Sequence, residues 1–417
     1  MTTAALSVAP RAAIVGAGPA GGGVSEVLSA AGIAHDLFDE QPRAGGNIGR
    51  RRFDAPAAPP EGDAPCNFHA GCRVLRVSPE REVEWDDGSA LHRGRYDAVF
   101  LCAGAYDGML PRGPRHESWS SAGALQALLK GQGIVPDGRV LIAGAGPFLH
   151  IAGADLVRAG AQVVAVVDAL PYRAYARLLP FARWGSLKIM LAARIALRRA
   201  GTSVRFGAQI AALGGDSAEL GDGTRIGFDH AGISDFFAPQ TQLARSAGCA
   251  QAWSPTGRYF FTPVDADYRS SIPGVFACGE AAGVRGGDHA RLSGLIAALA
   301  FLGRDRASYQ REARRLARFG AALETAMAAA EPRPADDAVA CMCERVTVDK
   351  ARQAVADGLR DLSSIKIVTR CGMGSCQGRY CEPVVGRLIA EAGIAPRAPL
   401  NQKALVRPLD VRELIGG

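Results

Sequence analysis

Residues 12–23 are Ala12-Ala13-Ile14-Val15-Gly16-Ala17-Gly18-Pro19-Ala20-Gly21-Gly22-Gly23. The apolar run that ends at Gly16 suits a buried parallel strand, and a helical pattern of apolar residues follows it as far as Gly32. Gly16 allows a tight turn, Gly18 leaves no Cβ between the backbone and a pyrophosphate, and Gly21 lets the helix pack closely on the strand. The amino end of the helix would hold the phosphate charge. This stretch therefore predicts a strand, a turn and a helix that bind a dinucleotide through Gly16, Ala17, Gly18, Pro19, Ala20 and Gly21.

Two acidic residues follow the second predicted strand. That strand covers residues 34–38 and leads to Asp39 and Glu40, where an acid would accept a hydrogen bond from a ribose 2′-hydroxyl. The glycines alone would also fit a merely glycine-rich turn. Strand, helix, second strand and acid in register favour a bound dinucleotide.

Three further segments are predicted to line the same ligand. The glycine-rich basic loop 41–52 offers amides to a phosphate or a flavin edge, with an exposed surface loop as the alternative. The apolar run 96–105 indicates a buried strand that closes on small residues, where a parallel sheet meets its ligand. Strand 274–278 leads to an acid that can bind ribityl hydroxyls, and a helix at 289–302 would face the flavin ring. The predicted binding residues are Gly45, Gly46, Asn47, Ala103, Gly104, Gly279 and Glu280.

A second copy of the opening pattern starts at Arg139. Gly144 and Gly146 repeat the first two glycines, and a strand at 163–167 ends at Asp168. Leu149 stands where Gly21 stands in the first copy, so the helix would lie slightly farther from its strand. Two interpretations stay open: a second dinucleotide, most simply a nicotinamide one because Asp168 disfavours a 2′-phosphate, or an empty vestigial fold.

The other elements are predicted more coarsely. Residues 53–65 are rich in Pro and Ala and indicate an irregular excursion. Residues 173–200 form a basic amphipathic region, for which core packing or a subunit contact is favoured over membrane binding. A helix is expected at 122–130, and strands are expected at 72–77, 82–85, 203–207, 218–220 and 226–233.

Five of the ten cysteines fall in one short region beyond a polar, Pro-containing linker at 332–337. Cys341 and Cys343 precede two predicted helices, 347–356 and 361–368, and Cys371, Cys376 and Cys381 follow them. Two close-set thiolate groups make a four-sulfur metal site, and glycines keep the second loop open so that its amides can point at sulfur. Zinc sites favour two residues between paired cysteines, whereas the gaps in this chain are one residue and four residues. An iron–sulfur centre therefore fits better. Zinc and redox-inert buried thiols remain the alternatives.

Composition bounds the function classes. The chain has 417 residues, 48% of them hydrophobic, so it can bury the cores of two or three domains. The net charge is +7, and the arginines are scattered along the sequence rather than clustered. Aromatic residues make up only 6% of the chain, which argues against a base-stacking nucleic-acid surface. Residues 1–10 lack the pattern of a signal peptide, and no apolar run reaches the ~18 residues of a membrane span. A cytoplasmic location is therefore expected, with thiols or metal ligands rather than disulfides.

The nucleotide-binding motifs together resemble the two-dinucleotide-binding-domain flavoprotein reductases. This resemblance covers roughly residues 12–303 and implies an α/β architecture of glutathione/thioredoxin reductase-like Rossmann domains. FAD is then expected in a first domain formed by 11–136 and 263–331, and NAD(P)H is left open for the inserted domain 137–262. The family commonly has Gln where Asn47 stands and Asp where Glu280 stands. No CxxC pair occurs in the sequence, so the chain lacks the paired thiols that a thioredoxin-reductase-like dithiol reaction needs.

The cysteine-rich segment resembles BFD-type (bacterioferritin-associated-ferredoxin) [2Fe-2S] domains. Their pattern maps onto Cys341, Cys343, Cys376 and Cys381, with Cys371 as a neighbour that could exchange with Cys376. We expect this small helical domain at 338–393 and a tail at 394–417. The order of parts is similar to the α (or A) subunits of heteromeric opine oxidases and of proline or hydroxyproline dehydrogenases, and to a hydrogen cyanide synthase subunit. That likeness implies an amine-oxidising flavoprotein β subunit, leaves a small third subunit open, and implies an electron acceptor or carrier.

A redox relay is the function that these observations favour. A flavin accepts two electrons together and a [2Fe-2S] cluster holds one, so one chain with both converts between the two. No catalytic acid or base is nominated, because the histidines, His150 and His289 included, are isolated in the sequence. Two other functions are weighed: a stand-alone NAD(P)H:acceptor oxidoreductase, and a metal-stabilised structural subunit with vestigial nucleotide folds.

Overall fold

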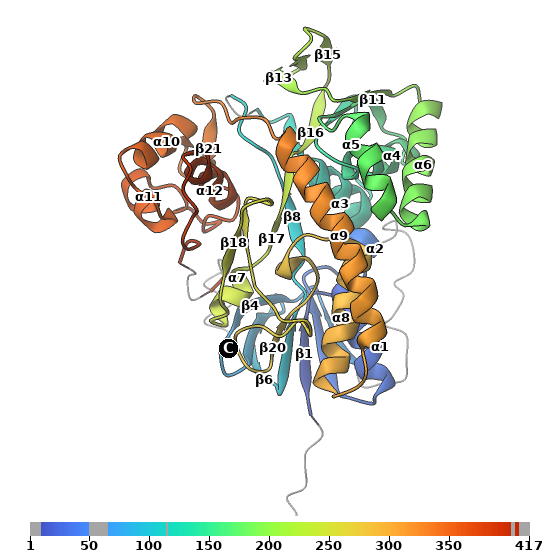
Figure 1. The fold of residues 1–417 in the computed structure, drawn as a ribbon, viewed down its shortest axis with the longest axis vertical. Helices are drawn as coiled ribbons and strands as arrows, with labels where there is room; N and C mark the ends of the chain where they lie inside the picture. Colours follow the sequence, from blue (N-terminus) through green and yellow to red (C-terminus); the bar gives the residue numbers. More distant parts are fainter. Residues whose placement is uncertain (1–9, 50–65, 114–115, 402–404, 408–417) are drawn as a thin grey trace, which may run out of the picture.

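The computed structural model describes residues 10–49, 66–113, 116–401 and 405–407. The predicted excursion 53–65, residues 50–52 of the basic loop, the absence of a leader in 1–9 and most of the tail beyond 401 lie outside the described residues. Two α/β halves are stacked along the long axis, and a small helical domain lies beside them (Figure 1). Within the described ranges, no helix combines the length and apolar character needed to cross a bilayer.

A five-stranded parallel sheet forms the lower half, in the order β20-β7-β1-β2-β3. Its central strands are apolar and fully buried, as a sheet covered on both faces requires. The antiparallel strands β4 (Arg73–Val77), β5 (Glu82–Asp86) and β6 (Leu91–Arg95) form a separate sheet. The parallel strands are β1 (Ala12–Val15), β2 (His35–Asp39), β3 (Cys66–Ala70), β7 (Ala98–Leu101) and β20 (Val275–Ala277).

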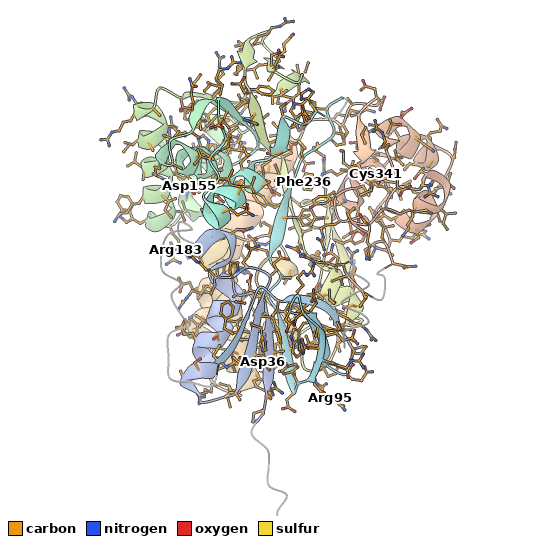
Figure 2. The ribbon with its side chains drawn as sticks, turned by 180° about the vertical axis from the view of Figure 1, so that it is seen from behind. Asp36, Arg95, Asp155, Arg183, Phe236 and Cys341 are labelled. Atoms are coloured by element: carbon orange, nitrogen blue, oxygen red, sulfur yellow. The ribbon has the colours of Figure 1, made fainter. Side chains whose placement is uncertain are left out.

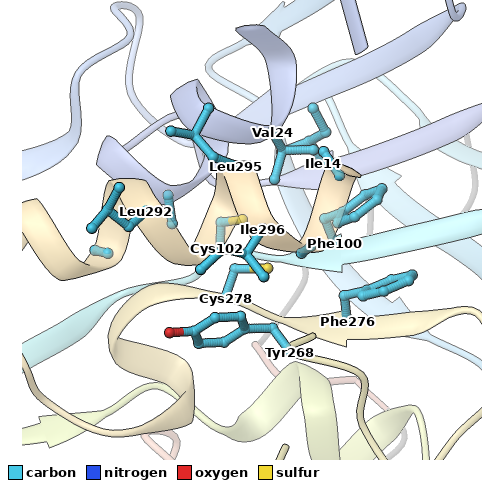
Figure 3. Packing of buried hydrophobic residues seen from close by; sticks show 14 of the residues in the cluster. Ile14, Val24, Phe100, Cys102, Tyr268, Phe276, Cys278, Leu292, Leu295 and Ile296 are labelled. Carbon is cyan, nitrogen blue, oxygen red and sulfur yellow. The ribbon is translucent and has the colours of Figure 1, made fainter. Parts of the chain in front are cut away.

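Two helices, α1 (Pro19–Ala30) and α8 (Gly287–Phe301), pack against each other and against this sheet. A Cβ on Gly294 would lie 2.0 Å from the Ala20 carbonyl oxygen, so the two helices touch backbone to backbone. Figure 3 shows side chains of both helices and of the sheet in one cluster, including Val24, Ile296 and Phe100. Each such fully buried side chain contributes roughly 1.5–3 kcal/mol of transfer free energy.

A second five-stranded parallel sheet forms the upper half, in the order β12-β11-β10-β16-β9. Strand β9 and helix α3 fall inside the predicted segment 11–136, yet β9 pairs with β16, so strand pairing joins these residues to the second half. The sheet consists of β9 (Trp119–Ser121), β10 (Arg139–Gly144), β11 (Gln162–Asp168), β12 (Ser203–Phe206) and β16 (His230–Ser234). Its helices are α3 (Ala122–Gln132), α4 (Phe148–Arg158), α5 (Tyr172–Leu178) and α6 (Trp184–Arg199).

Smaller elements complete the two halves. The antiparallel pair β8 (Ala105–Gly108) and β17 (Phe236–Pro239) connects them. The predicted strand 226–233 is in fact two strands, because the chain turns through the buried Phe228 between β15 and β16. The remaining elements are α2 (Gly46–Gly49), β13 (Ile210–Leu213), β14 (Ser217–Leu220), β15 (Arg225–Gly227), α7 (Gln242–Ser246), β18 (Ala252–Ser254), β19 (Tyr259–Phe261) and the short 3-10 helices Leu179–Phe181 and Gly279–Ala282.

Helix α9 (Ala307–Ala330) runs from the lower half to the upper half (Figure 1). It leads into the linker and then the small domain, which has its own core around Ile365 and Ile389. The elements of this domain are β21 (Val339–Cys341), β22 (Val346–Thr347), α10 (Val348–Ala356), α11 (Leu362–Thr369) and α12 (Glu382–Glu391).

The basic region 173–200 is only partly core. Leu178, Ala193 and Leu197 are buried, but Trp184 is 71% exposed and Leu191 is 62% exposed. Core packing therefore accounts for one side of these helices and leaves an apolar side open.

Candidate functional site

One open cavity lies at the carboxyl ends of β1, β2, β7 and β20. Parallel α/β sheets bind ligands at this edge. Most of the predicted binding residues line the cavity: Gly16, Gly18, Pro19, Ala20, Asp39, Glu40, Gly46, Asn47, Ala103, Gly104, Gly279 and Glu280.

Three predicted residues shape the cavity from outside its lining. The Ala17 amide donates to Asp39 Oδ2 at 2.7 Å, and the Gly45 amide donates to the Ala17 carbonyl at 2.7 Å. A Cβ on Gly21 would lie 1.9 Å from the Gly16 carbonyl oxygen, which explains why only glycine fits there. These contacts hold the first turn against the end of β2 and against the loop that follows.

The first turn has the geometry that a pyrophosphate needs. Gly16 has a φ of +104°, and a Cβ there would lie 2.3 Å from the Cys102 carbonyl oxygen. Gly46 approaches Gly18 so closely that a Cβ on Gly46 would lie 2.8 Å from the Gly18 Cα. Two stretches of bare backbone thus form a cradle into which a phosphate group can fit.

The acids beside the cavity have different environments. Asp39 also accepts from the Gln41 amide at 2.8 Å, while Glu40 pairs with Arg407 at 2.6 Å. Burial raises the pKa of Glu280, which favours its protonated form as a hydrogen-bond donor or acceptor for hydroxyl groups. These residues fit a bound FAD.

His289 lies in the core rather than in the cavity. Its Nε2 is 3.1 Å from the Tyr268 hydroxyl, and burial together with the nearby Arg285 lowers its pKa to about 4. The cavity lining contains no histidine, lysine or tyrosine in the part of the chain that the structure describes.

The five clustered cysteines lie in two groups. The Sγ atoms of Cys341, Cys371 and Cys381 lie within 4.8 Å of one another and are buried. Cys376 shares a side-chain hydrogen bond with the exposed Cys343. The predicted ligands are therefore divided between the groups, and the predicted spare, Cys371, belongs to the buried one.

The surroundings of these sulfurs fit an iron–sulfur centre. The Gly372 amide donates to Cys341 Sγ at 3.5 Å, and hydrogen bonds from Cys371 and Cys381 lower the pKa of Cys341. A Cβ on Gly374 would lie 2.1 Å from the Cys343 Cβ, so this glycine lets the second loop close on the first cysteine pair. Close thiolates with backbone amides directed at them are the donor set that a [2Fe-2S] cluster uses.

The second cysteine loop reaches the cavity. Arg379, between Cys376 and Cys381, lines the cavity, and its carbonyl accepts from the Tyr106 hydroxyl. The Tyr106 ring meets the Tyr380 ring edge-on, with centroids 5.9 Å apart. Arg379 Nε is buried with no hydrogen-bond partner in the described ranges, so the cavity has a cation to offer an anionic ligand.

A buried ion pair fixes the same loop to the lower half. Arg245 donates to Glu382 Oε2 at 2.9 Å, and the Leu400 amide donates to the same oxygen at 2.8 Å. Sequence reasoning missed Arg379, Tyr106 and this pair, since no spacing rule links residues so far apart in the chain.

The second glycine turn faces a different environment. Gly144 and Gly146 have φ values of +136° and +100°, as in a nucleotide-binding turn. Asp168 is fully buried, and a side chain of α9, Met327, contacts Gly146. The residues around this turn therefore do not fit a dinucleotide as those of the first turn do.

Residues 10–294 match the family model described as pyridine nucleotide-disulphide oxidoreductase. The chain belongs to this family. Residues 339–391 match the BFD-like [2Fe-2S] binding domain, so the predicted fold class is confirmed. This member is an FAD-dependent oxidoreductase with an iron–sulfur domain.

Relatives extend the match over nearly the whole chain. The opine oxidase A protein of Agrobacterium tumefaciens (strain Ach5) is 30% identical, with 96% of this chain and 90% of the relative covered. The HcnB protein of hydrogen cyanide synthase from Pseudomonas protegens is 27% identical over 93% and 95%. The L-proline dehydrogenase structure from P. horikoshii has a TM-score of 0.66 and 17% identity, covering 95% of this chain and 78% of that one. The predicted resemblance is confirmed, and the last comparison supports the fold alone.

Proposed function

We propose that this chain is the electron-transfer subunit of a heteromeric amino-acid or opine dehydrogenase or oxidase. The relatives named as opine oxidase and hydrogen cyanide synthase subunits support this assignment, because they match over most of both chains. Substrates of the hydroxyproline, proline or octopine/nopaline type are the proposed class.

Two cofactors are assigned to this chain's own residues. FAD would lie on the turn Gly16–Gly21, beside Asp39, Gly46 and Glu280, and the cluster would be held by Cys341, Cys343, Cys376 and Cys381. Bound flavin exchanges electrons in pairs or singly, and a [2Fe-2S] cluster exchanges them singly.

The position of Arg379 is the observation that carries the proposal. It lies between two proposed cluster ligands and also lines the cavity that contains Gly16 and Gly279. A loop that touches both proposed sites would hold a bound flavin and a bound cluster near each other. The Tyr106–Tyr380 contact and the Arg245–Glu382 pair hold it there.

Amine oxidation is proposed to occur on a partner subunit. Abstraction of a proton from an amine substrate needs a positioned base such as histidine or lysine. The described cavity lining has neither, and its acids are paired or buried. This chain therefore accepts electrons rather than oxidising the amine itself.

A basic apolar face supports a contact with that partner. The sequence has no acidic residue between Asp168 and Asp216, and this interval contains Arg173, Arg177, Arg183, Lys188, Arg194, Arg198, Arg199 and Arg205. Arg183 pairs with Asp288 and Glu312, and Arg205 pairs with Asp222, so the other cations give this region its positive charge. The exposed apolar side chains of this interval are Tyr172, Leu179, Phe181, Trp184, Ile189, Leu191 and Ile195. A partner with an acidic rim around an apolar centre would cover them.

Anaerobic purification from the native host tests the proposal. The expected preparation contains flavin and iron and co-purifies with a second flavoprotein, and adding an amine substrate reduces the cluster of the complex but not that of the isolated chain. A chain whose flavin bleaches with NADH unaided would instead be a stand-alone reductase. A colourless chain without iron would be a structural subunit.

A further inference from the structure

The two glycine turns of this chain can be compared directly, because both connect a parallel strand to a helix. In the first, the point where a Cβ on Gly18 would lie has Gly46 Cα as its nearest neighbour, at 3.8 Å. In the second, the same point on Gly146 has Met327 Sδ at 3.0 Å. In such turns a pyrophosphate approaches the backbone at this glycine, which is Gly18 in the first turn and Gly146 in the second. In the second turn, a side chain of α9 fills the space over that glycine.

The end of α9 is firmly attached at this turn. Leu323, Ala326, Met327 and Ala330 pack with Ala145 and Leu170 in one apolar cluster. The Gln209 side-chain amide donates to the Ala330 carbonyl at 3.0 Å. The next residue, Glu331, pairs with Arg258 at 2.9 Å and with Arg387 at 2.8 Å. The helix end is therefore bound both to the second fold and to the iron–sulfur domain.

Asp168, the acid predicted for the second dinucleotide site, has no acceptor site left. Its Oδ1 accepts from the amides of Gly146 and Leu170, at 3.0 and 2.9 Å. Its Oδ2 contacts His150 Nε2 at 2.9 Å and accepts from the Tyr175 hydroxyl at 2.5 Å. A carboxylate has about four lone-pair sites, so two donors on each oxygen saturate it.

The Gly146 amide is engaged in the same network. It donates to Asp168, so it is not directed at a phosphate. The His150 ring stacks on Phe206 with centroids 5.0 Å apart, and the Tyr175 ring meets both at their edges. Asp168 is thus enclosed in aromatic rings and is fully buried.

We propose that the second nucleotide-binding fold is closed to NAD(P)H, with the end of α9 in place of the dinucleotide. The fold then serves as a platform that positions α9 and, through Glu331, the iron–sulfur domain. This inference deepens the proposed relay: electrons enter the chain from a protein partner and not from a pyridine nucleotide on this fold. It rests on the relay only for the origin of the electrons.

A nucleotide titration tests the closure. Full-length protein loaded with FAD is titrated anaerobically with NADH and NADPH to about 1 mM, the upper end of usual KM values. Binding is read from the nucleotide's own fluorescence, and reduction is read from the flavin absorbance. The expected result is no saturable binding and no bleaching. Saturable binding with flavin reduction would overturn the proposal.

A pair of matched variants tests the cause. Met327→Ala with Tyr175→Phe removes the sulfur over Gly146 and one donor to Asp168, so saturable NADH binding should become measurable. Met190→Ala with Tyr309→Phe makes the same chemical changes on α6 and at the exposed start of α9, and should bind no better than the wild type. If the first variant keeps its circular dichroism and FAD content but binds no NADH, closure by α9 is wrong.

The titration also separates this inference from the relay. A preparation without iron would contradict the relay, yet NADH fluorescence would still report on the second fold. A preparation with FAD, iron and a partner that also binds NADH would contradict only the closure.

Discussion

At the scale of single residues, the cysteines give the most direct test. We expect Cys376→Ala to lose most of the bound iron and the visible absorbance of the cluster, because it removes a proposed ligand. Cys371→Ala should keep the iron and change the spectrum little. Iron analysis of anaerobically purified variants, with the buried Cys249→Ala as a control outside the cluster, checks both. Iron lost from Cys371→Ala and kept in Cys376→Ala would exchange the two roles.

His289 gives a pH prediction at the same scale. Burial depresses its pKa to about 4, so the folded chain keeps this ring neutral at a pH where the unfolded chain, with a pKa near 6.5, takes up a proton. Stability from this site is therefore full above about pH 6.5 and falls as the pH drops toward 4, by about 2 kcal/mol at pH 5. Unfolding of the wild type and of His289→Gln between pH 7 and 5 measures it. An equal loss in both would exclude His289 as the source.

At the scale of elements, local patterns predicted the parts whose ligand contacts are local. Gly16 to Gly21 and the strands around them were predictable because one short segment contains turn, strand end and helix start. The role of helix α9 was not predictable, because its sequence has no nucleotide-binding motif. That role depends on the contact of Met327 with a turn that begins at Gly144, far away in the sequence. Arg379 was missed for the same reason: only tertiary packing brings it to the cavity.

The ion pair of Glu331 with Arg387 anchors the end of α9 to the iron–sulfur domain, and this anchor gives the prediction at the scale of elements. Glu331→Gln leaves Arg387, which is 1% exposed, without its countercharge, and breaking such a buried pair costs about 3–5 kcal/mol. We expect faster proteolysis in the linker 332–337 and slower electron transfer between flavin and cluster, with both cofactors retained. Glu219→Gln breaks the exposed pair with Arg225 and should change neither, because surface pairs contribute about 0–1 kcal/mol. Equal linker cleavage in both variants would contradict the anchor.

At the scale of the whole molecule, the proposed cluster site and the proposed partner-binding face lie on different sides. The cysteine domain lies on one side of the upper half and α6 on the other, and Figure 2 shows Cys341 and Arg183 on opposite sides as well. A partner on the basic apolar face would therefore leave the exposed Cys343 side of the cluster open for an electron carrier.

Trp184→Ser with Leu191→Ser should abolish co-purification of the amine-oxidising subunit while flavin and iron content stay unchanged. Leu128→Ser with Ile134→Ser removes exposed apolar side chains of the same half away from this face, and should keep the partner bound. Loss of the partner in the first variant and not in the second supports this face as the contact, and retention in both would place the partner elsewhere.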